Sequence, residues 1–166
     1  MSRDAVHGNL TEITLIACDF DGPDSARILL DYAQERRSIV GFDDPPGLDN
    51  AIEYRSPHGR FVLAYTAAGD TVACGGVRTY PHREHVMEIR KMYVRPDYRI
   101  LGLGRRILAE LEQYAVIHGA HEVLLETGSY NHAAIHLYTA AGYRLIPAYV
   151  PGRPDFNRAF TKRLAP

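Results

Sequence analysis

Residues 99–104 (Arg-Ile-Leu-Gly-Leu-Gly) constrain the fold more than any other part of this sequence. An extended run ends at Pro96 just before them, and a helical pattern begins directly after them. A helix that opens after a strand and a short glycine-bearing turn presents unpaired backbone N–H groups and the positive end of its dipole at one point. The segment therefore predicts a strand–turn–helix unit, an arrangement that binds phosphate groups.

The side chains around this turn fit a ligand loop and a structural turn equally well. Gly102 and Gly104 have no β-carbon, so a diphosphate could approach their backbone closely. Arg99 and Arg105 would add charge-assisted hydrogen bonds to its oxygens. Many strand–helix turns carry glycine simply to turn, so the choice between the two depends on the flanking sequence.

Composition limits the classes of protein that remain. The 166 residues, 46% of them hydrophobic and 23% charged, predict a single globular domain over residues 1–166. The net charge of −1 gives no electrostatic case for a nucleic-acid partner. The apolar run at residues 13–17 is too short to cross a bilayer, and Cys18 and Cys74 fit free thiols in a reducing compartment. We therefore expect a cytoplasmic protein without a membrane partner.

Hydrophobic periodicity predicts alternating strands and helices. Ala26, Leu29, Leu30 and Ala33 are expected to form the buried stripe of a first helix that starts near residue 23 and ends near Arg37. The other elements are expected as strands at 9–17, 61–67, 71–80, 85–95, 122–126, 143–148 and 157–163, and as helices at 49–54, 103–118 and 131–141. This order predicts an α/β fold with a mixed sheet and helices on both faces.

A second block supports the ligand interpretation of the glycine turn. Residues 124–143 read as a strand, a turn with Asn131, and a helix that carries the pattern Leu-Tyr-x-x-x-Gly-Tyr. Together with residues 86–104, this block resembles the coenzyme A motifs of the GNAT acetyltransferase superfamily. The resemblance covers residues 86–145 and implies a mostly antiparallel sheet of six to seven strands in which a central pair of strands splays apart.

The same resemblance assigns a set of residues to the cofactor, acetyl-CoA. The pyrophosphate loop would be formed by Arg99, Ile100, Leu101, Gly102, Leu103, Gly104 and Arg105, and the cofactor arm would contact Met92, Tyr93, Val94, Asn131 and Tyr138. Leu101 departs from the superfamily pattern, which more often has a polar residue there. Asn131 also fits a plain helix N-cap, and the two uses are compatible.

Acetyl transfer to an amine requires a base and an acid. An alkyl ammonium has a pKa near ~10, so a base must remove its proton at neutral pH. The resemblance implies Glu88 as that base and Tyr138 as the acid that protonates the departing thiolate, with the backbone N–H of Met92 or Tyr93 holding the oxyanion. The alternatives are a solvated carboxylate paired with Arg90 or Lys91, and a core tyrosine.

No metal is expected. His132 and His136 have an i, i+4 spacing that can hold zinc, but no third ligand lies near them in the sequence, so they fit surface positions.

Three functions are consistent with these residues. The first is an N-acetyltransferase that moves the acetyl group of acetyl-CoA to a small-molecule primary amine by direct transfer in a ternary complex. The second acetylates a protein lysine or N-terminus, and the third binds coenzyme A without turnover. Loops 38–50 and 147–157 are expected to line the acceptor groove, and many members of the superfamily pair as homodimers through a sheet edge.

Overall fold

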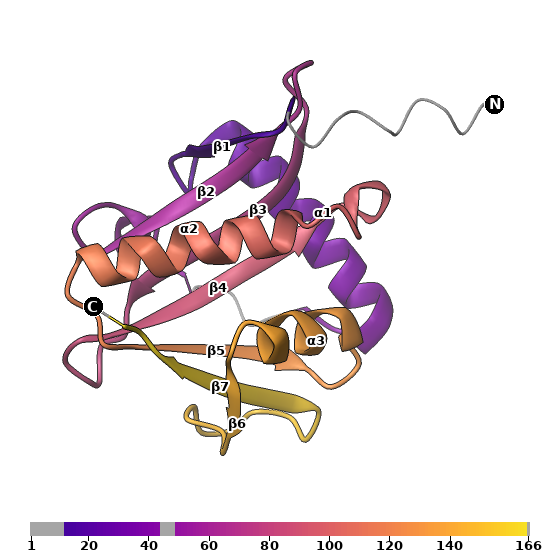
Figure 1. Cartoon of the computed structure of the whole chain (residues 1–166). Helices are drawn as coiled ribbons and strands as arrows, with labels where there is room; N and C mark the ends of the chain where they lie inside the picture. The colour runs from indigo at the N-terminus through magenta and orange to yellow at the C-terminus, as the bar shows by residue number, and fades with distance from the viewer. Residues whose placement is uncertain (1–11, 44–48, 166) are drawn as a thin grey trace.

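In the computed structural model, residues 12–43 and 49–165 are described, and they form one seven-stranded sheet covered by three α-helices (Figure 1). The strands are β1 (Thr14–Ala17), β2 (Gly59–Tyr65), β3 (Thr71–Thr79), β4 (Val86–Val94), β5 (Glu122–Gly128), β6 (Arg144–Ile146) and β7 (Asn157–Arg163). The helices are α1 (Pro23–Val40), α2 (Leu103–Ile117) and α3 (His132–Ala140), with short 3-10 helices η3 (Ala51–Tyr54) and η4 (Pro96–Tyr98).

The strand order is β1-β2-β3-β4-β5-β7-β6, and β4–β5 is the parallel pair of the described sheet. Each other neighbouring pair is antiparallel. Parallel strands need a crossover connection, which α2 supplies between β4 and β5. The mixed, mostly antiparallel sheet expected from the sequence is confirmed, and its strand number lies at the upper end of the expected six to seven.

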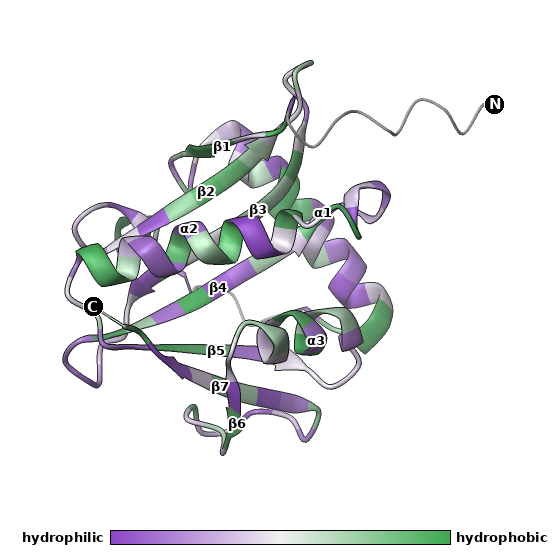
Figure 2. Cartoon of the chain, in the orientation of Figure 1, coloured by the Kyte–Doolittle hydropathy of each residue, from purple (hydrophilic) through white to green (hydrophobic). Residues whose placement is uncertain are grey.

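Helices cover both faces of the sheet, as expected (Figure 1). One core lies under α2 and α3 and includes Ile107, Leu111, Val123 and Leu125, each with no measurable exposure. The core on the opposite face lies under α1 and is built from Ile28, Tyr54, Phe61, Leu63, Cys74 and Tyr93. The two layers leave the middle of the sheet buried on both sides, and Figure 2 shows apolar colouring along β2, β3 and β5.

Helix α1 presents a different face to the sheet from the one expected. The expected start near residue 23 is confirmed, because Gly22 is the N-cap and Pro23 the first helical residue. The expected stripe is wrong at three of its four positions, since Ala26, Leu30 and Ala33 are exposed. Ile28, nearly opposite Leu30 around the helix, is fully buried. The buried side of α1 consists of Ser25 and Ile28, with Leu29 and Tyr32 packed beside them, and Tyr32 lies against Tyr93.

Several expected boundaries shift by a few residues. The first strand is observed only from Thr14, and residues 9–11 of the expected strand lie outside the described residues. The expected strand at 143–148 is limited to Arg144–Ile146, and α1 continues to Val40, where Gly41 ends it in the left-handed conformation. Both cysteines are free thiols, as expected. None of the helices in the described part of the chain is both long and apolar enough to span a membrane.

Candidate active site

The centre of the sheet is split. β4 and β5 pair over only four residues, from Val86 opposite Glu122 to Ile89 opposite Leu125. Beyond this point β4 runs on to Val94 and β5 to Gly128 without further pairing between them. In Figure 1 the two strands meet at one end and diverge toward the N-terminal end of α2. The expected splay is therefore present, and it leaves one edge of β4 without a neighbouring strand.

A β-bulge marks the start of the split. The register between β3 and β4 shifts between Cys74 and Gly76, and Lys91 opposite this shift has a φ of 59°, which is in the left-handed region. Gly75 fits the bulge because a β-carbon on it would lie 2.6 Å from Ile107 and 2.7 Å from the Met92 sulfur. Met92 and Val94 then pack beside the α2–α3 core.

The turn before α2 offers a run of free backbone donors. Arg99 N donates to the Pro96 carbonyl at 3.3 Å and Arg106 N to the Gly102 carbonyl at 3.1 Å. Between them, no acceptor in the described part of the chain bonds the N–H groups of residues 100–105. Six consecutive unpaired donors at a helix N-terminus form the anion-binding arrangement expected from the sequence.

Two residues of this turn adopt the left-handed conformation. Gly102 has a φ of 78° and Ile100 a φ of 63°. Glycine adopts this conformation freely, whereas a β-branched residue there is a true outlier and indicates a local constraint. The Ile100 side chain is fully exposed, so packing against the core does not hold it. Leu103 does point into the core, since it is 1% exposed.

The two expected phosphate-binding arginines are in different states. Arg99 forms a bidentate ion pair with Glu35 of α1, with both oxygens 2.7 Å from Nη2, and its Nε donates to the Val94 carbonyl. Arg105 is exposed and makes no side-chain hydrogen bond within the described residues. Gly104 has a packing role as well, because a β-carbon on it would lie 3.1 Å from Leu137 of α3.

Tyr138 lies in the core between α3 and the sheet. It is 4% exposed and packs near the rings of Tyr143 and Phe160. Burial raises the pKa of its hydroxyl, and the nearby Tyr32 on α1 raises it further. The phenol therefore keeps its proton at neutral pH, the state that a general acid needs.

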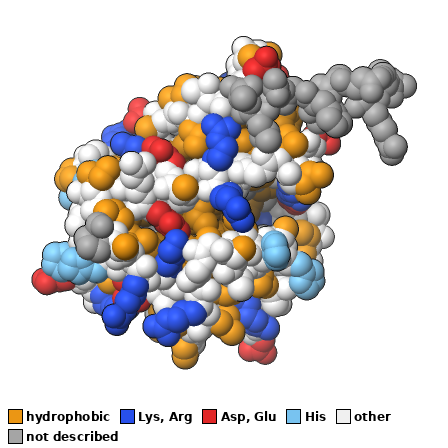
Figure 3. Space-filling model, viewed as in Figure 1, with side chains coloured by type: hydrophobic (Ala, Val, Ile, Leu, Met, Phe, Trp, Pro, Cys, Tyr) orange, Lys and Arg blue, Asp and Glu red, His pale blue; other side chains and the backbone are white. Residues whose placement is uncertain are grey.

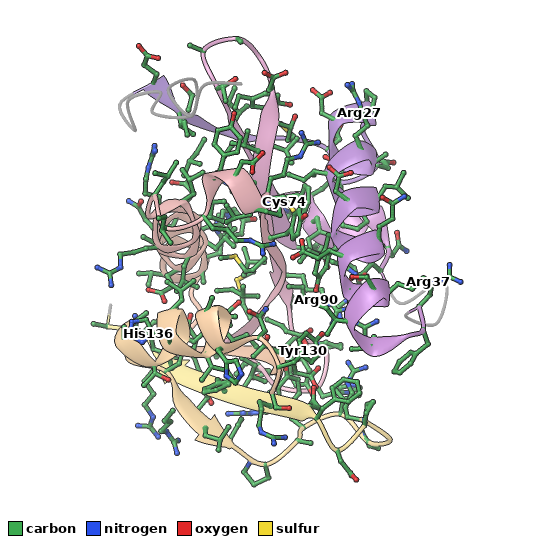
Figure 4. All side chains as sticks on the ribbon, turned by 90° about the vertical axis from the view of Figure 1, so that its right-hand side faces the viewer. Arg27, Arg37, Cys74, Arg90, Tyr130 and His136 are labelled. Carbon is green, nitrogen blue, oxygen red and sulfur yellow. The ribbon has the colours of Figure 1, made fainter. Side chains whose placement is uncertain are left out.

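Asn131 caps α3. Its side-chain oxygen accepts a hydrogen bond from the backbone N–H of Ala134 at 3.2 Å. The capping role considered from the sequence is confirmed. His132 and His136 lie exposed on the same helix, and His136 is labelled in Figure 4. Within the described residues no group of three or more His, Cys, Asp or Glu side chains is arranged to hold a metal ion.

Glu88 is buried beneath the split and is not the solvated carboxylate considered as an alternative. Its side chain is 2% exposed and is paired with two guanidinium groups. Arg78 donates to Oε2 at 3.2 and 3.1 Å, and Arg90 lies 3.6 Å from Oε1. The Tyr149 hydroxyl donates to Oε1 at 2.8 Å. A buried carboxylate of this kind stays charged only because it is paired and hydrogen-bonded.

Asp49 forms a second charged centre beside Glu88. It accepts hydrogen bonds from Arg90 at 3.0 Å, Lys91 at 2.9 Å and the Tyr54 hydroxyl at 2.7 Å. Burial alone would raise the pKa of Asp49, but the charges of Lys91 and Arg90 outweigh burial and hold it well below its ordinary value. Arg90 therefore joins both acidic centres, and Figure 4 shows it in the space between α1 and α3.

Glu88 and its neighbour Arg90 were named from the sequence, but Arg78, Asp49 and Tyr149 were not. Arg78 could have been found, because it is paired directly with Glu88 across the β3–β4 hairpin. Asp49 and Tyr149 come from segments 39 and 61 positions away from Glu88, and no local spacing pattern connects them. Loop 147–157 was expected to line the acceptor groove, and Tyr149 and Arg153 bring it to the site through Glu88 and through Glu126 of β5.

Charge around the site is balanced. Ion pairs join the acidic residues Asp49, Glu53, Glu88 and Glu126 to the cations Arg78, Arg90, Lys91 and Arg153. On the face of the molecule that carries α2 and α3, acidic, basic and apolar side chains are likewise interspersed (Figure 3).

Comparison with known proteins gives the family. The sequence model of the Acetyltransferase (GNAT) family matches residues 25–143, which is more than half of the chain. The chain therefore belongs to the GNAT family of acetyltransferases. Its N-alpha-acetyltransferase RimI relative from Mycobacterium tuberculosis is 34% identical over 117 residues, which cover 68% of this chain and 69% of that protein. The matched range includes both the split between β4 and β5 and the turn before α2.

One further relative matches over a smaller part of its length, whereas solved structures of the same fold match over nearly all of theirs. The IAA acetyltransferase of Azospirillum brasilense is 33% identical over 99 residues, which cover 60% of this chain and 63% of that protein. Among solved structures, a Klebsiella pneumoniae protein has a TM-score of 0.77 at 25% identity and covers 95% of this chain and 100% of its own. The Salmonella typhimurium protein yncA, solved with its cofactor acetyl-CoA, has a TM-score of 0.71 at 19% identity. The match covers 93% of this chain and 95% of that protein.

Proposed function

We propose that this protein, as a single domain over residues 1–166, transfers the acetyl group of acetyl-CoA to the primary amine of a small molecule in a ternary complex. The observation that carries the proposal is the end of the β4–β5 pairing at Ile89 and Leu125, next to six unpaired N–H groups. A protein of the same fold solved with acetyl-CoA, and relatives named as N-acetyltransferases, support the same reaction. Loop 147–157 contacts Glu88 through Tyr149 and Glu126 through Arg153, and this cover over the site supports a small acceptor molecule.

The described residues fit the cofactor. A diphosphate would be held by the N–H groups of residues 100–105, with Arg105 free to add a charge-assisted hydrogen bond. The pantetheine arm would lie against the free edge of β4 at Met92, Tyr93 and Val94, and Asn131 would approach it from the start of α3. When bound, acetyl-CoA supplies the acetyl group in activated form, as a thioester.

Two side chains would move protons. Glu88 accepts the proton of the acceptor ammonium, which leaves a neutral amine that can attack. Tyr138 donates its hydroxyl proton to the departing sulfur, and its raised pKa keeps that proton in place until then. The backbone N–H of Met92 or Tyr93, at the edge of β4 that lacks a partner strand, would stabilise negative charge on the acetyl oxygen.

Two measurements test this function. The first is the melting temperature with and without acetyl-CoA, because a ligand at a hundred times its dissociation constant adds about 2.7 kcal/mol of stability. The second is thiol release from acetyl-CoA across a library of primary amines, amino acids and lysine peptides. Binding followed by turnover of small amines is expected. Turnover of peptides alone would replace the small-molecule acceptor by a protein acceptor, and binding without any turnover would leave a coenzyme A-binding module.

A further inference from the structure

Glu88 is enclosed by its partners. Its Oε2 accepts two hydrogen bonds from Arg78, and its Oε1 accepts one from the Tyr149 hydroxyl at 2.8 Å, with Arg90 3.6 Å away. With 2% of the side chain exposed, the carboxylate offers almost no surface to an acceptor molecule. A proton that reaches Glu88 therefore has to pass through one of these three partners.

Only one of the three partners can pass a proton on. A guanidinium group has five donors and no acceptor, and it does not lose its charge in proteins, so Arg78 and Arg90 cannot relay a proton. A phenol hydroxyl both donates and accepts. Tyr149 already donates to Oε1, which leaves the lone pairs of its oxygen available to a group on the other side.

The placement of Tyr149 suits this task. Its side chain is partly exposed, in contrast to Glu88, and its ring packs edge-to-face on Tyr80 with 5.6 Å between the ring centroids. Loop 147–157, which carries it, is held to β5 by the bidentate pair of Arg153 with Glu126. Burial, followed by the negative charge of Glu88, raises the pKa of Tyr149, so the hydroxyl keeps the proton that it donates.

We propose that Tyr149 relays the proton of the acceptor amine to Glu88, an inference that rests on the proposed function. An N–H bond of the acceptor ammonium breaks while a new O–H bond forms on the Tyr149 oxygen. The original hydroxyl proton of Tyr149 moves to Oε1 of Glu88 at the same time. Tyr149 ends with one proton as before, Glu88 becomes a neutral acid, and the nitrogen keeps the electron pair with which it attacks.

The direct test is the pH profile of Tyr149→Phe, which keeps the ring and removes only the hydroxyl. At neutral pH we expect kcat/KM for an alkylamine acceptor to fall by about a hundredfold, the lower end of general base catalysis. The loss should shrink as the pH approaches the acceptor's own pKa, because the amine then arrives neutral. Tyr80→Phe is the matched control, since Tyr80 packs on Tyr149 but is not among the described partners of Glu88.

Further variants separate a relay from a structural effect. Glu88→Gln should show the same pH-dependent loss as Tyr149→Phe, and the double variant should be no slower than either single one. Acetyl-CoA affinity, measured by calorimetry, should be unchanged in Tyr149→Phe. A loss that is equal at every pH, or losses that multiply in the double variant, would overturn the relay while the acetyltransferase function stands. A wild-type protein that binds acetyl-CoA but acetylates no amine would overturn the proposed function, and the relay with it.

Discussion

The Sγ atom of Cys74 lies 3.2 Å from the carbonyl oxygen of Lys91, to which the thiol donates a hydrogen bond. Lys91 is the residue of β4 that adopts the left-handed conformation, so this bond joins β3 to the bulge at which the sheet splits. The thiol is fully buried, and burial raises its pKa to about 12. Cys74 therefore acts as a neutral donor at a position where the ladder of β3 and β4 is interrupted.

Cys74→Ala should loosen the bulge. We expect a loss of about 1 kcal/mol in the free energy of unfolding, the usual contribution of one hydrogen bond, and weaker binding of acetyl-CoA. Urea unfolding and calorimetric titration measure the two effects. Cys74→Ser is the matched control, because its hydroxyl can donate to the same carbonyl and should restore part of the affinity. Equal affinities for all three proteins would show that the bond does not shape the binding edge.

Tyr138→Phe should lower turnover without weakening cofactor binding. The variant keeps the ring in its place beside Tyr143 and Phe160 but removes the proton donor. We expect kcat to fall by about a hundredfold. Steady-state kinetics with the best amine of the library, together with the dissociation constant of acetyl-CoA, measure both quantities. Tyr143→Phe removes a neighbouring hydroxyl that donates to Glu112 and should leave kcat intact. An unchanged kcat in Tyr138→Phe would remove the acid role.

Gly104→Ala tests whether the glycine serves the cofactor or the packing of α3. A β-carbon there reaches Leu137, and it also narrows the approach to the N–H groups of residues 100–105. We expect acetyl-CoA to bind about tenfold more weakly, which corresponds to about 1.4 kcal/mol. The double variant Gly104→Ala/Leu137→Ala relieves the contact with α3 and should stay as weak as the single one. Recovery of affinity in the double variant would assign the effect to packing.

Asp49→Asn should destabilise the protein in a pH-dependent way. Because the pKa of Asp49 is held below its ordinary value in the folded state, its stabilising contribution is complete above the unfolded-state pKa of about 3.9 and is lost as the pH falls below that value. We expect the variant to be about 2–4 kcal/mol less stable at pH 7, since it removes the ion pair of Lys91 and leaves Arg90 only its more distant pairing with Glu88.

Urea unfolding at pH 7 and near pH 3 measures this difference, which should become smaller at the lower pH. The control is Asp97→Asn in η4, an exposed aspartate without an ion pair in the described structure. Its effect should be small at both pH values. A deficit for Asp49→Asn that is as large at pH 3 as at pH 7 would contradict the electrostatic explanation.

The elements that could be predicted from the sequence are those in which neighbouring residues determine the structure. The helix expected at 103–118 is confirmed as α2, and its regularly spaced apolar residues are all buried: Leu103, Ile107, Leu108, Leu111 and Ala115. The donor-rich turn was equally predictable, since glycine and a helix start are local features. The buried face of α1 was not, because it combines the apolar Ile28 with Ser25 and Tyr32, and hydrophobic periodicity does not count serine or tyrosine as buried positions.

The environment of Glu88 was beyond the reach of local patterns. A solvated carboxylate and a buried one have the same sequence signature, and what distinguishes them here is Tyr149 from a distant loop and Arg78 from the neighbouring strand. Such a site exists only once β4 lies in the middle of the sheet. The strand order therefore determines which acidic and basic residues meet at the site, and local sequence patterns do not reveal that order.

Because the pairing of β4 with β5 ends early, this sheet has an unpaired strand edge in its interior. Unpaired strand edges normally lie at the two ends of a sheet, where their free N–H and C=O groups can pair with a strand of another molecule and cause aggregation. Here the stretch of β4 after Ile89 has its unpaired backbone groups between two halves of one sheet. In this interior position the same groups face another part of the protein's own sheet and not the surface of a second molecule.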